Sequence, residues 1–131
     1  MTSRIKAMQA QMPRVEHQRT IQREELVQYI AQRTGLNQGE ILLVLYELRD
    51  AISYYLRVGY GVKLEGLGTW LPNIQLNGIF NVQYRLDRGL KRALNGVNEF
   101  YGKIINRKNI GKTPDELVAQ WNAEHPDDPV V

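Results

Sequence analysis

The side chains with the clearest chemical capacity in this chain are cations. Near residue 90 they follow one another at intervals of one to three residues, as Arg85, Arg88, Lys91 and Arg92. Such a cluster can hold phosphate groups or an acidic partner, because several positively charged donors come within reach of one anion. A solvated surface is the alternative interpretation. The further candidates for the same kind of contact are Lys63, Arg4, Lys6, Arg14 and Arg19.

The sequence offers little for catalysis. His17 and His125 lie in flanking segments, and no serine–histidine set or carboxylate pair at a recognisable spacing accompanies them. Gly66 and Gly68 mark a bend without the third glycine and the helix of a nucleotide-binding turn. The chain has no cysteine, which excludes disulfides and thiolate metal sites. We therefore expect a protein that is not an enzyme and has no catalytic residues, metal site or cofactor.

The net charge of +3 is unevenly distributed along the chain. Residues 1–23 are basic, residues 24–96 are nearly neutral and residues 97–131 are acidic. A dedicated DNA binder usually has a more basic body than this, so we expect the extensions to make contacts of their own. No apolar run is long enough to span a membrane or to form a secretory signal, which predicts a non-exported protein without a membrane partner.

Both extensions, residues 1–19 and 97–131, carry apolar residues at helical spacing. Met8 and Met12 predict a short amphipathic helix after Ser3, with a frayed end as the alternative. Near the other end, the capping box that starts at Thr113 predicts a helix at about 114–124. The segment 97–112 is left unassigned. We expect the extensions to dock on a neighbouring protein, or alternatively on their own body, through Met8, Met12, Leu117, Val118 and Trp121.

The body, residues 20–96, begins with two predicted helices. The first, at about 21–34, has Thr20 as its expected N-cap, and the second, at about 38–58, has Asn37. The second helix is apolar in nearly every direction, and a domain of roughly 75 residues is too small to cover it alone. We therefore expect an intertwined dimer or a ring of subunits. The predicted oligomer core is Ile41, Leu42, Leu45, Leu48, Ile52 and Tyr55.

After Gly59 the pattern changes to that of strands. Val62 and Leu64 alternate with polar residues, and a second strand starts at Thr69 after the glycine bend. A hairpin with a three-residue loop, Asn77 to Ile79, would pair Leu76 with Phe80. This register places eight apolar side chains on one face: Trp70, Pro72, Ile74, Leu76, Phe80, Val82, Tyr84 and Leu86.

The predicted hairpin contains no Lys or Arg between Lys63 and Arg85. After it, Asp87 is the expected N-cap of a last short helix that runs from Arg88 to about Asn95 and stops at Gly96. The overall prediction is an α+β domain with two N-terminal helices, a three-stranded antiparallel sheet, a short C-terminal helix and two extensions.

The segments Glu25–Leu36 and Gly59–Trp70, together with the run Leu90-Lys-Arg-Ala-Leu94, resemble the HU/IHF family of bacterial DNA-bending proteins. The chain is especially similar to the short-armed HU-like domains of Bacteroidetes and their phages. The resemblance covers about residues 20–96 and implies an intertwined dimer. Family members bind DNA with two long cationic β-arms. Here the arm is short and uncharged, so the family's DNA-binding residues do not carry over.

Two functions follow as hypotheses. The first is a structural or assembly protein that uses an HU/IHF-like fold for contacts with itself, a paralogous subunit or neighbouring assembly proteins, for example as a portal–tail ring component of a phage virion. The second is a sequence-independent, architectural binder of double-stranded DNA that uses the cations named above on phosphates. The expected location is the bacterial cytoplasm or a phage virion.

Overall fold

The computed structural model describes residues 2–130, which form two compact units. One unit comprises Arg19–Phe100, and we call it the HU-like unit. The other joins the two ends of the chain, up to Gln18 and from Tyr101, and we call it the terminal unit. The chain has the predicted α+β composition of helices with a three-stranded antiparallel sheet.

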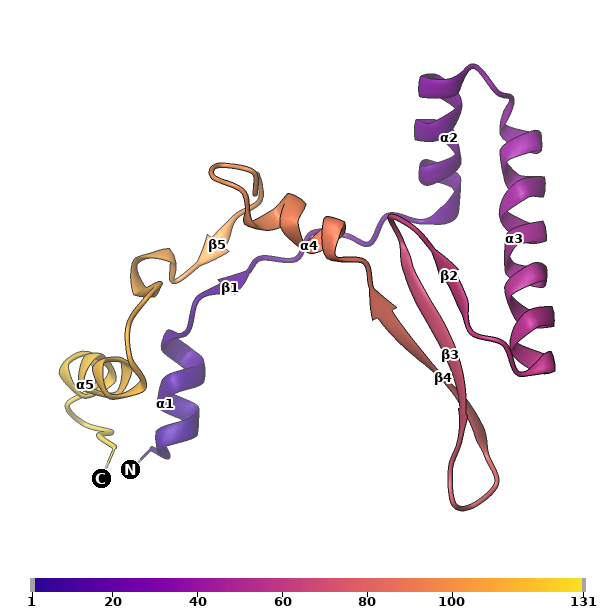
Figure 1. Cartoon of the computed structure of the whole chain (residues 1–131). Helices are drawn as coiled ribbons and strands as arrows, with labels where there is room; N and C mark the ends of the chain where they lie inside the picture. Colours follow the sequence, from indigo (N-terminus) through magenta and orange to yellow (C-terminus); the bar gives the residue numbers. More distant parts are fainter. Residues whose placement is uncertain (1, 131) are drawn as a thin grey trace. The chain divides into compact units, whose positions relative to one another are not determined.

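The HU-like unit begins with an antiparallel helical hairpin, α2 (Arg23–Thr34) and α3 (Gln38–Val58) (Figure 1). The Asn37 side chain accepts a hydrogen bond from the Glu40 backbone N–H, which confirms the predicted N-cap of α3. Gly59 ends α3 with a left-handed φ of 98°. Thr20 was wrong as the predicted N-cap of α2: the N-cap is Gln22, which makes no side-chain capping bond, and residues 16–22 form no regular secondary structure.

The sheet has the order β2 (Val62–Leu64), β3 (Gly68–Ile74) and β4 (Phe80–Leu86), and all its neighbours are antiparallel. Strands β3 and β4 extend beyond β2 as a two-stranded arm (Figure 1). The helix α4 (Arg88–Asn95) follows directly, and the Asp87 carboxylate caps it by accepting from the Gly89 N–H at 2.8 Å, as predicted.

The register of the arm differs from the predicted one. Ile74 lies opposite Phe80, whereas the sequence predicted Leu76 in that place. The loop has three residues, but it consists of Leu76–Gly78, flanked by a hydrogen bond from the Gln75 N–H to the Ile79 carbonyl. The reason is that Gly78 has a left-handed φ of 84°, which suits the last position of a three-residue hairpin loop. The shift is by two residues, so the other apolar side chains still share one face, and only Leu76 lies in the loop.

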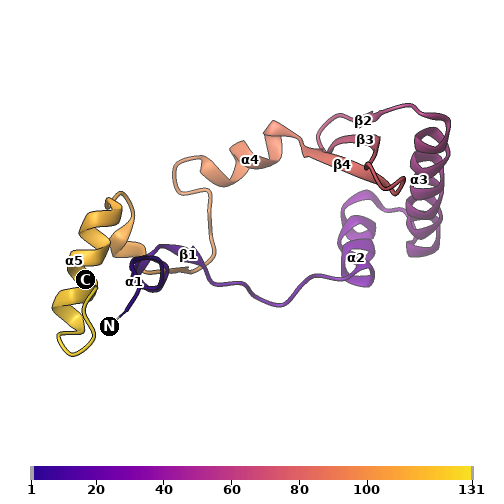
Figure 2. The same cartoon turned by 90° about the horizontal axis from the view of Figure 1, so that it is seen from below.

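In the terminal unit, α1 (Arg4–Gln11) packs against α5 (Pro114–Glu124) (Figures 1 and 2). The strands β1 (Arg14–Val15) and β5 (Ile104–Ile105) form a small antiparallel ribbon, and a 3₁₀ turn, η1 (Arg107–Asn109), lies between β5 and α5. The bounds of α5 match the predicted helix, and the Thr113 hydroxyl caps it by accepting from the Glu116 N–H. The previously unassigned segment 97–112 thus contains β5 and η1.

Asparagine side chains hold η1 onto the C-terminal end of α1. Asn109, which is 1% exposed, donates from Nδ2 to the Gln11 carbonyl at 2.6 Å. Asn106 donates to the carbonyls of Ala10 and Met12. These bonds satisfy carbonyl groups that a helix leaves without an internal partner. The two ends of the chain therefore fold as one body, and the HU-like unit is inserted between them in sequence.

Candidate functional site

The apolar surface of α3 is only partly covered by its own chain. Among the predicted oligomer core residues, Ile41 is buried, Tyr55 is exposed, and four are half-buried: Leu42, Leu45, Leu48 and Ile52. The most open apolar residues on this helix are others, namely Leu43, Val44, Tyr54 and Val58. Sequence reasoning missed them, because a helix that is apolar all round does not reveal which side its own chain will cover.

Helix α4 buries none of its residues in the chain. Leu90 and Leu94 lie four residues apart and therefore share one face, and both are exposed, at 41% and 59%. The cations Arg88, Lys91 and Arg92 lie on the same short helix and are also exposed. Helix α4 is thus amphipathic, and its apolar face has no cover among residues 2–130.

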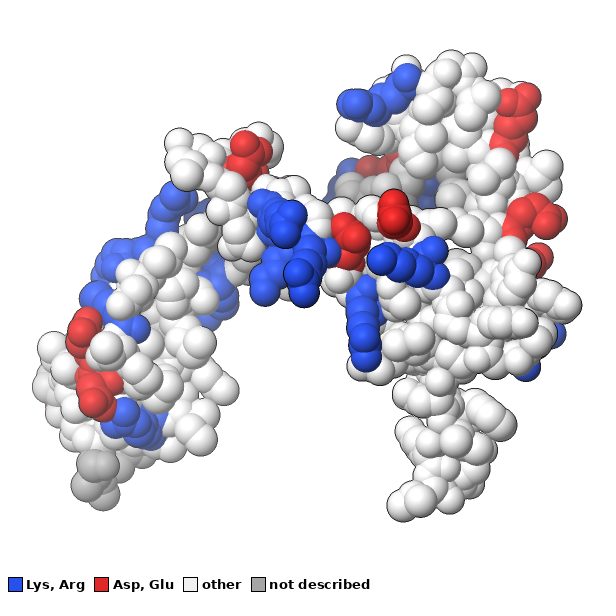
Figure 3. Space-filling model, viewed as in Figure 1, with Lys and Arg blue, Asp and Glu red and all other residues white. Residues whose placement is uncertain are grey.

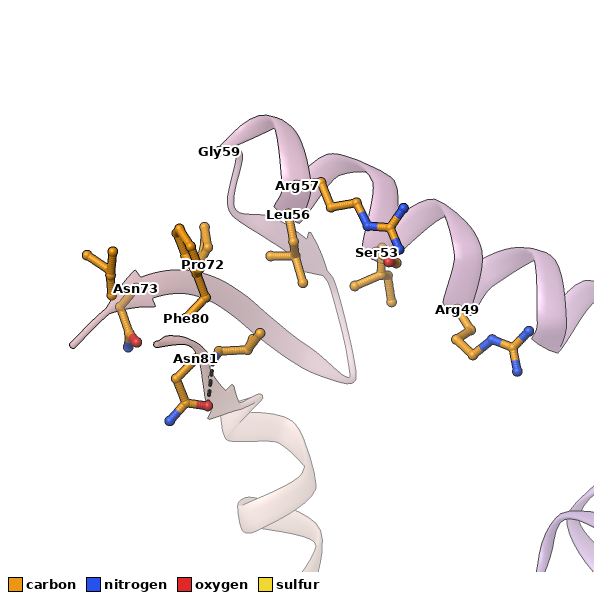
Figure 4. A pocket seen from close by; sticks show the side chains of 12 residues that line it. Arg49, Ser53, Leu56, Arg57, Gly59, Pro72, Asn73, Phe80 and Asn81 are labelled. Carbon is orange, nitrogen blue, oxygen red and sulfur yellow. Dashed lines mark hydrogen bonds between the residues drawn. The ribbon is translucent and has the colours of Figure 1, made fainter. Parts of the chain in front are cut away.

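A groove of about 840 Å³ runs between α3 and the arm. Its lining includes Ile52 and Leu56 of α3 and Pro72, Phe80 and Val82 of the arm. In Figure 4, Leu56 projects from α3 on the side of the strand that carries Pro72, while the guanidinium groups of α3 lie away from Pro72 and Phe80. The groove thus lies between half-buried apolar side chains of α3 and the apolar face of the arm, which suits a protein side chain or strand as its occupant.

The arm itself carries no charged side chain between Glu65 and Arg85. In Figure 3 its protruding end is white throughout, without a blue or red atom. Leu76 is fully exposed in the loop, and Phe80 is 77% exposed. The arm therefore presents apolar and amide groups and has no charge with which to bind a phosphate backbone.

A second, smaller cleft of about 240 Å³ gathers three of the predicted cations: Lys63, Arg85 and Arg88. Lys63 lies opposite Thr69 on β3, and Thr69 lies opposite Arg85 on β4, so the three residues form one row across the sheet. Two strand spacings separate the cations by roughly 9–10 Å at the backbone. An anion such as a phosphate group could bind between them, above the Thr69 hydroxyl, against the opposing charge of the Asp87 carboxylate, which also lines the cleft.

The remaining predicted cations do not gather in that cleft. Lys91 and Arg92 lie further along α4. Arg19 makes a two-bond ion pair with Glu25, and the carboxylate raises the pKa of the guanidinium. Arg4 pairs with Asp115 at 2.5 Å. Arg4 and Arg19 are thus already matched by carboxylates, whereas Lys6 and Arg14 are exposed in the terminal unit.

The predicted docking residues of the extensions lie largely inside the terminal unit. Leu117 and Trp121 are buried, and the indole Nε1 of Trp121 donates to the Asp128 carbonyl at 2.8 Å. Met8 and Val118 are half-buried, and only Met12 is exposed. Leu117 and Trp121 are thus covered within the terminal unit, in which α5 packs against α1 from the other end of the chain, and they are not exposed to a neighbouring protein.

Within residues 2–130 the structure shows no group of three His, Asp or Glu side chains that could hold a metal ion. In the same part of the chain, no helix is both long and apolar enough to cross a bilayer.

The helical hairpin, the three-stranded sheet with its arm and the short final helix together define an HU-like domain. Residues 3–102 match the model of a protein family described as an HU domain fused to a wHTH, an Ig or a glycine-rich motif. The chain belongs to this family. No curated protein and no solved structure gave a match. An HU-like domain points to an architectural or DNA-binding role.

Proposed function

We propose that this chain is a non-enzymatic architectural protein whose HU-like domain binds another protein chain, in the simplest case a second copy of itself. The observation that carries this proposal is α4. It has eight residues and buries none of them within the chain. Isolated helices shorter than about 12–15 residues are marginal in water. A partner that covers Leu90 and Leu94 would supply the missing stabilisation.

The open face of α3 supports the same proposal. Leu43 and Val44 are 61% and 63% exposed, and the core of the HU-like unit contains only Val27 and Ile41 as buried apolar side chains among the described residues. A second subunit would complete this core. The uncharged arm favours contacts with protein over contacts with DNA. A component of a larger assembly, such as a portal–tail ring in a phage virion, requires protein contacts of this kind. A bacterial cytoplasmic assembly would use the same surfaces.

The test measures the mass of the purified full chain by light scattering and sedimentation. We expect a dimer or a higher oligomer, and we expect Leu94→Asp to yield a smaller species, because it places a charge in the covered face. Lys91→Gln, on the same helix, is the matched control and should leave the mass unchanged. A wild-type chain that is monomeric while NMR shows α4 to be helical would overturn the proposal.

A second candidate function, sequence-independent binding of double-stranded DNA, is favoured by the row of Lys63, Thr69 and Arg85 with Arg88 beside it. Each phosphate contact adds roughly 0.9 to the slope of log affinity against log salt. Arg85→Ala should therefore weaken duplex binding and reduce that slope by about one. Arg33→Ala, on α2, is the control. Absence of duplex binding at low salt would remove this candidate.

A further inference from the structure

The arm has two outer edges. The Gln75 N–H donates to the Ile79 carbonyl at 2.9 Å. Paired residues in an antiparallel ladder alternate between those that exchange hydrogen bonds and those that do not. Counting from this bond, the residues of β4 that point their backbone N–H and C=O groups away from β3 are Phe80, Val82, Tyr84 and Leu86.

Proline protects the outer edge of β3. Strand β2 covers this edge only as far as Trp70. The next outward position is Pro72, which lies opposite Val82 and does not exchange ladder bonds with it. Proline has no N–H, so another strand cannot continue the sheet at that point. This is a device by which natural sheets avoid unwanted edge pairing.

The outer edge of β4 has no comparable protection. From Phe80 to Tyr84 it contains no proline and no charged residue. Phe80, Val82 and Tyr84 are 77%, 44% and 48% exposed. The Val82 N–H is covered by the Oδ1 atom of the adjacent Asn81 at 2.8 Å, drawn as the dashed line in Figure 4. This local bond can be exchanged for an intermolecular one without leaving the N–H unpaired.

We propose that β4 of one copy pairs antiparallel with β4 of another copy, which joins the two arms into one continuous sheet. The β4 sequence is complementary to itself when the pairing is centred on Val82. Phe80 then lies opposite Tyr84 of the second copy, and Asn81 lies opposite Gln83. Apolar side chains meet on one face and amides on the other, with no charge in the paired segment and about six backbone hydrogen bonds.

The absence of charge is what selects a second copy as the occupant of this edge. Two arms that carried like charges would repel each other at this distance, whereas these arms have none. Shifting the pairing toward α4 would include Arg85, and shifting it the other way would include the left-handed Gly78. The pairing centred on Val82 avoids both.

This inference rests on the proposed protein-binding function, but it uses a different surface from the faces of α3 and α4. The two therefore fail in distinguishable ways. Leu94→Asp reports on the helical interface alone. Loss of arm pairing would leave that interface and its dimer intact and would remove only the larger species.

The test compares Val82→Pro with Val82→Thr in the full chain by sedimentation over a range of concentrations. Because the Val82 N–H is not used in the pairing with β3, proline leaves the arm's own ladder intact and removes the outward donor. We expect wild type and Val82→Thr to form a species of twice the mass that Val82→Pro reaches. Identical mass distributions for all three proteins would overturn the proposal.

A second measurement does not depend on how well the proline variant folds. The chain has no cysteine, so a single introduced thiol is a clean probe. At the centre of the pairing the two Cα atoms of residue 82 would be about 5.5 Å apart, within the range of a disulfide. Val82→Cys should therefore form a covalent dimer on oxidation at least tenfold faster than Asn73→Cys, an exposed control on β3. Equal rates for the two variants would overturn the proposal.

Discussion

Trp121 is the residue on which we expect the terminal unit to depend most. Its side chain is 8% exposed, and its ring stacks on His125 with 3.7 Å between ring centroids. Its Nε1 atom donates to the Asp128 carbonyl, which ties the end of the chain to α5. Trp121→Ala would remove the largest buried side chain of this unit together with that hydrogen bond.

The magnitude follows from burial and size. Replacing a buried tryptophan by alanine costs about 3–5 kcal/mol. The terminal unit has roughly 50 residues, and a core of that size rarely supplies more than about 3–5 kcal/mol. The two values are comparable, so Trp121→Ala should unfold most of the terminal unit. The HU-like unit, which has its own contacts, should remain folded.

Hydrogen exchange measured on peptides is the appropriate assay. Protection should fall in α5 and, more tellingly, in α1, which is more than 100 residues away in sequence but packs against α5. Protection in α3 should stay as in the wild type. Trp121→Phe is the matched control. It keeps an aromatic ring but loses the Nε1 donor, which should cost about 1–3 kcal/mol and leave more of the unit folded. Unchanged protection of α1 in Trp121→Ala would refute the reasoning.

Two further predictions concern acid and the glycine bend at Gly66 and Gly68. The Thr2 hydroxyl lowers the pKa of the Asp128 carboxyl, and the Gln120 and Gln11 amides lower the pKa of Glu124. Lowered values contribute stability above the ordinary carboxylate pKa of about 4, and this contribution is lost as the pH falls through the lowered values. In the HU-like unit, a backbone hydrogen bond and Arg23 lower the pKa of Glu24 in the same way. Two such carboxyls lie in the smaller terminal unit and one in the HU-like unit, so NMR should show the terminal unit loosening in acid before the HU-like unit. Preferential loosening of the HU-like unit would contradict this. At the bend, a Cβ on Gly68 would lie 2.5 Å from the Arg85 carbonyl oxygen, so Gly68→Ala should cost about 3 kcal/mol or more in denaturant unfolding. Gly66→Ala meets no atom within 4 Å and should cost only the strain of its left-handed backbone, about 1–2 kcal/mol; equal losses would count against the steric argument.

Much of the HU-like unit could be predicted from the sequence, because its signals are local. The caps Asn37 and Asp87 and the helix end at Gly59 depend on groups within a few residues of one another. The placement of the arm's apolar side chains on one face follows from the two-residue period of a strand alone. The tip register could not be predicted to the residue, because Asn77-Gly78 fits more than one three-residue loop. The left-handed conformation of Gly78 decides between them.

The candidate site was predictable only in part. The cations near residue 90 are evident in the sequence, but the row that joins Lys63 to Arg85 across Thr69 exists only once three strands are paired. Likewise, the sequence does not reveal that Arg4 and Arg19 are matched by carboxylates. Ion pairs of this kind depend on where separate segments lie in space, which has no periodic signature.

The sequence by itself determined the HU-like fold of about residues 20–96, the absence of charge on the arm and the helix at about 114–124, and it indicated a second helix near the N-terminus. Only the tertiary structure decided what those end helices do. The sequence pattern showed Leu117 and Trp121 as an apolar face in need of a partner, with a neighbouring protein or the chain's own body as the two alternatives. The structure supplies α1 of the same chain. Helical periodicity specifies that a face must be buried but not which surface buries it, because that choice depends on contacts between residues far apart in sequence.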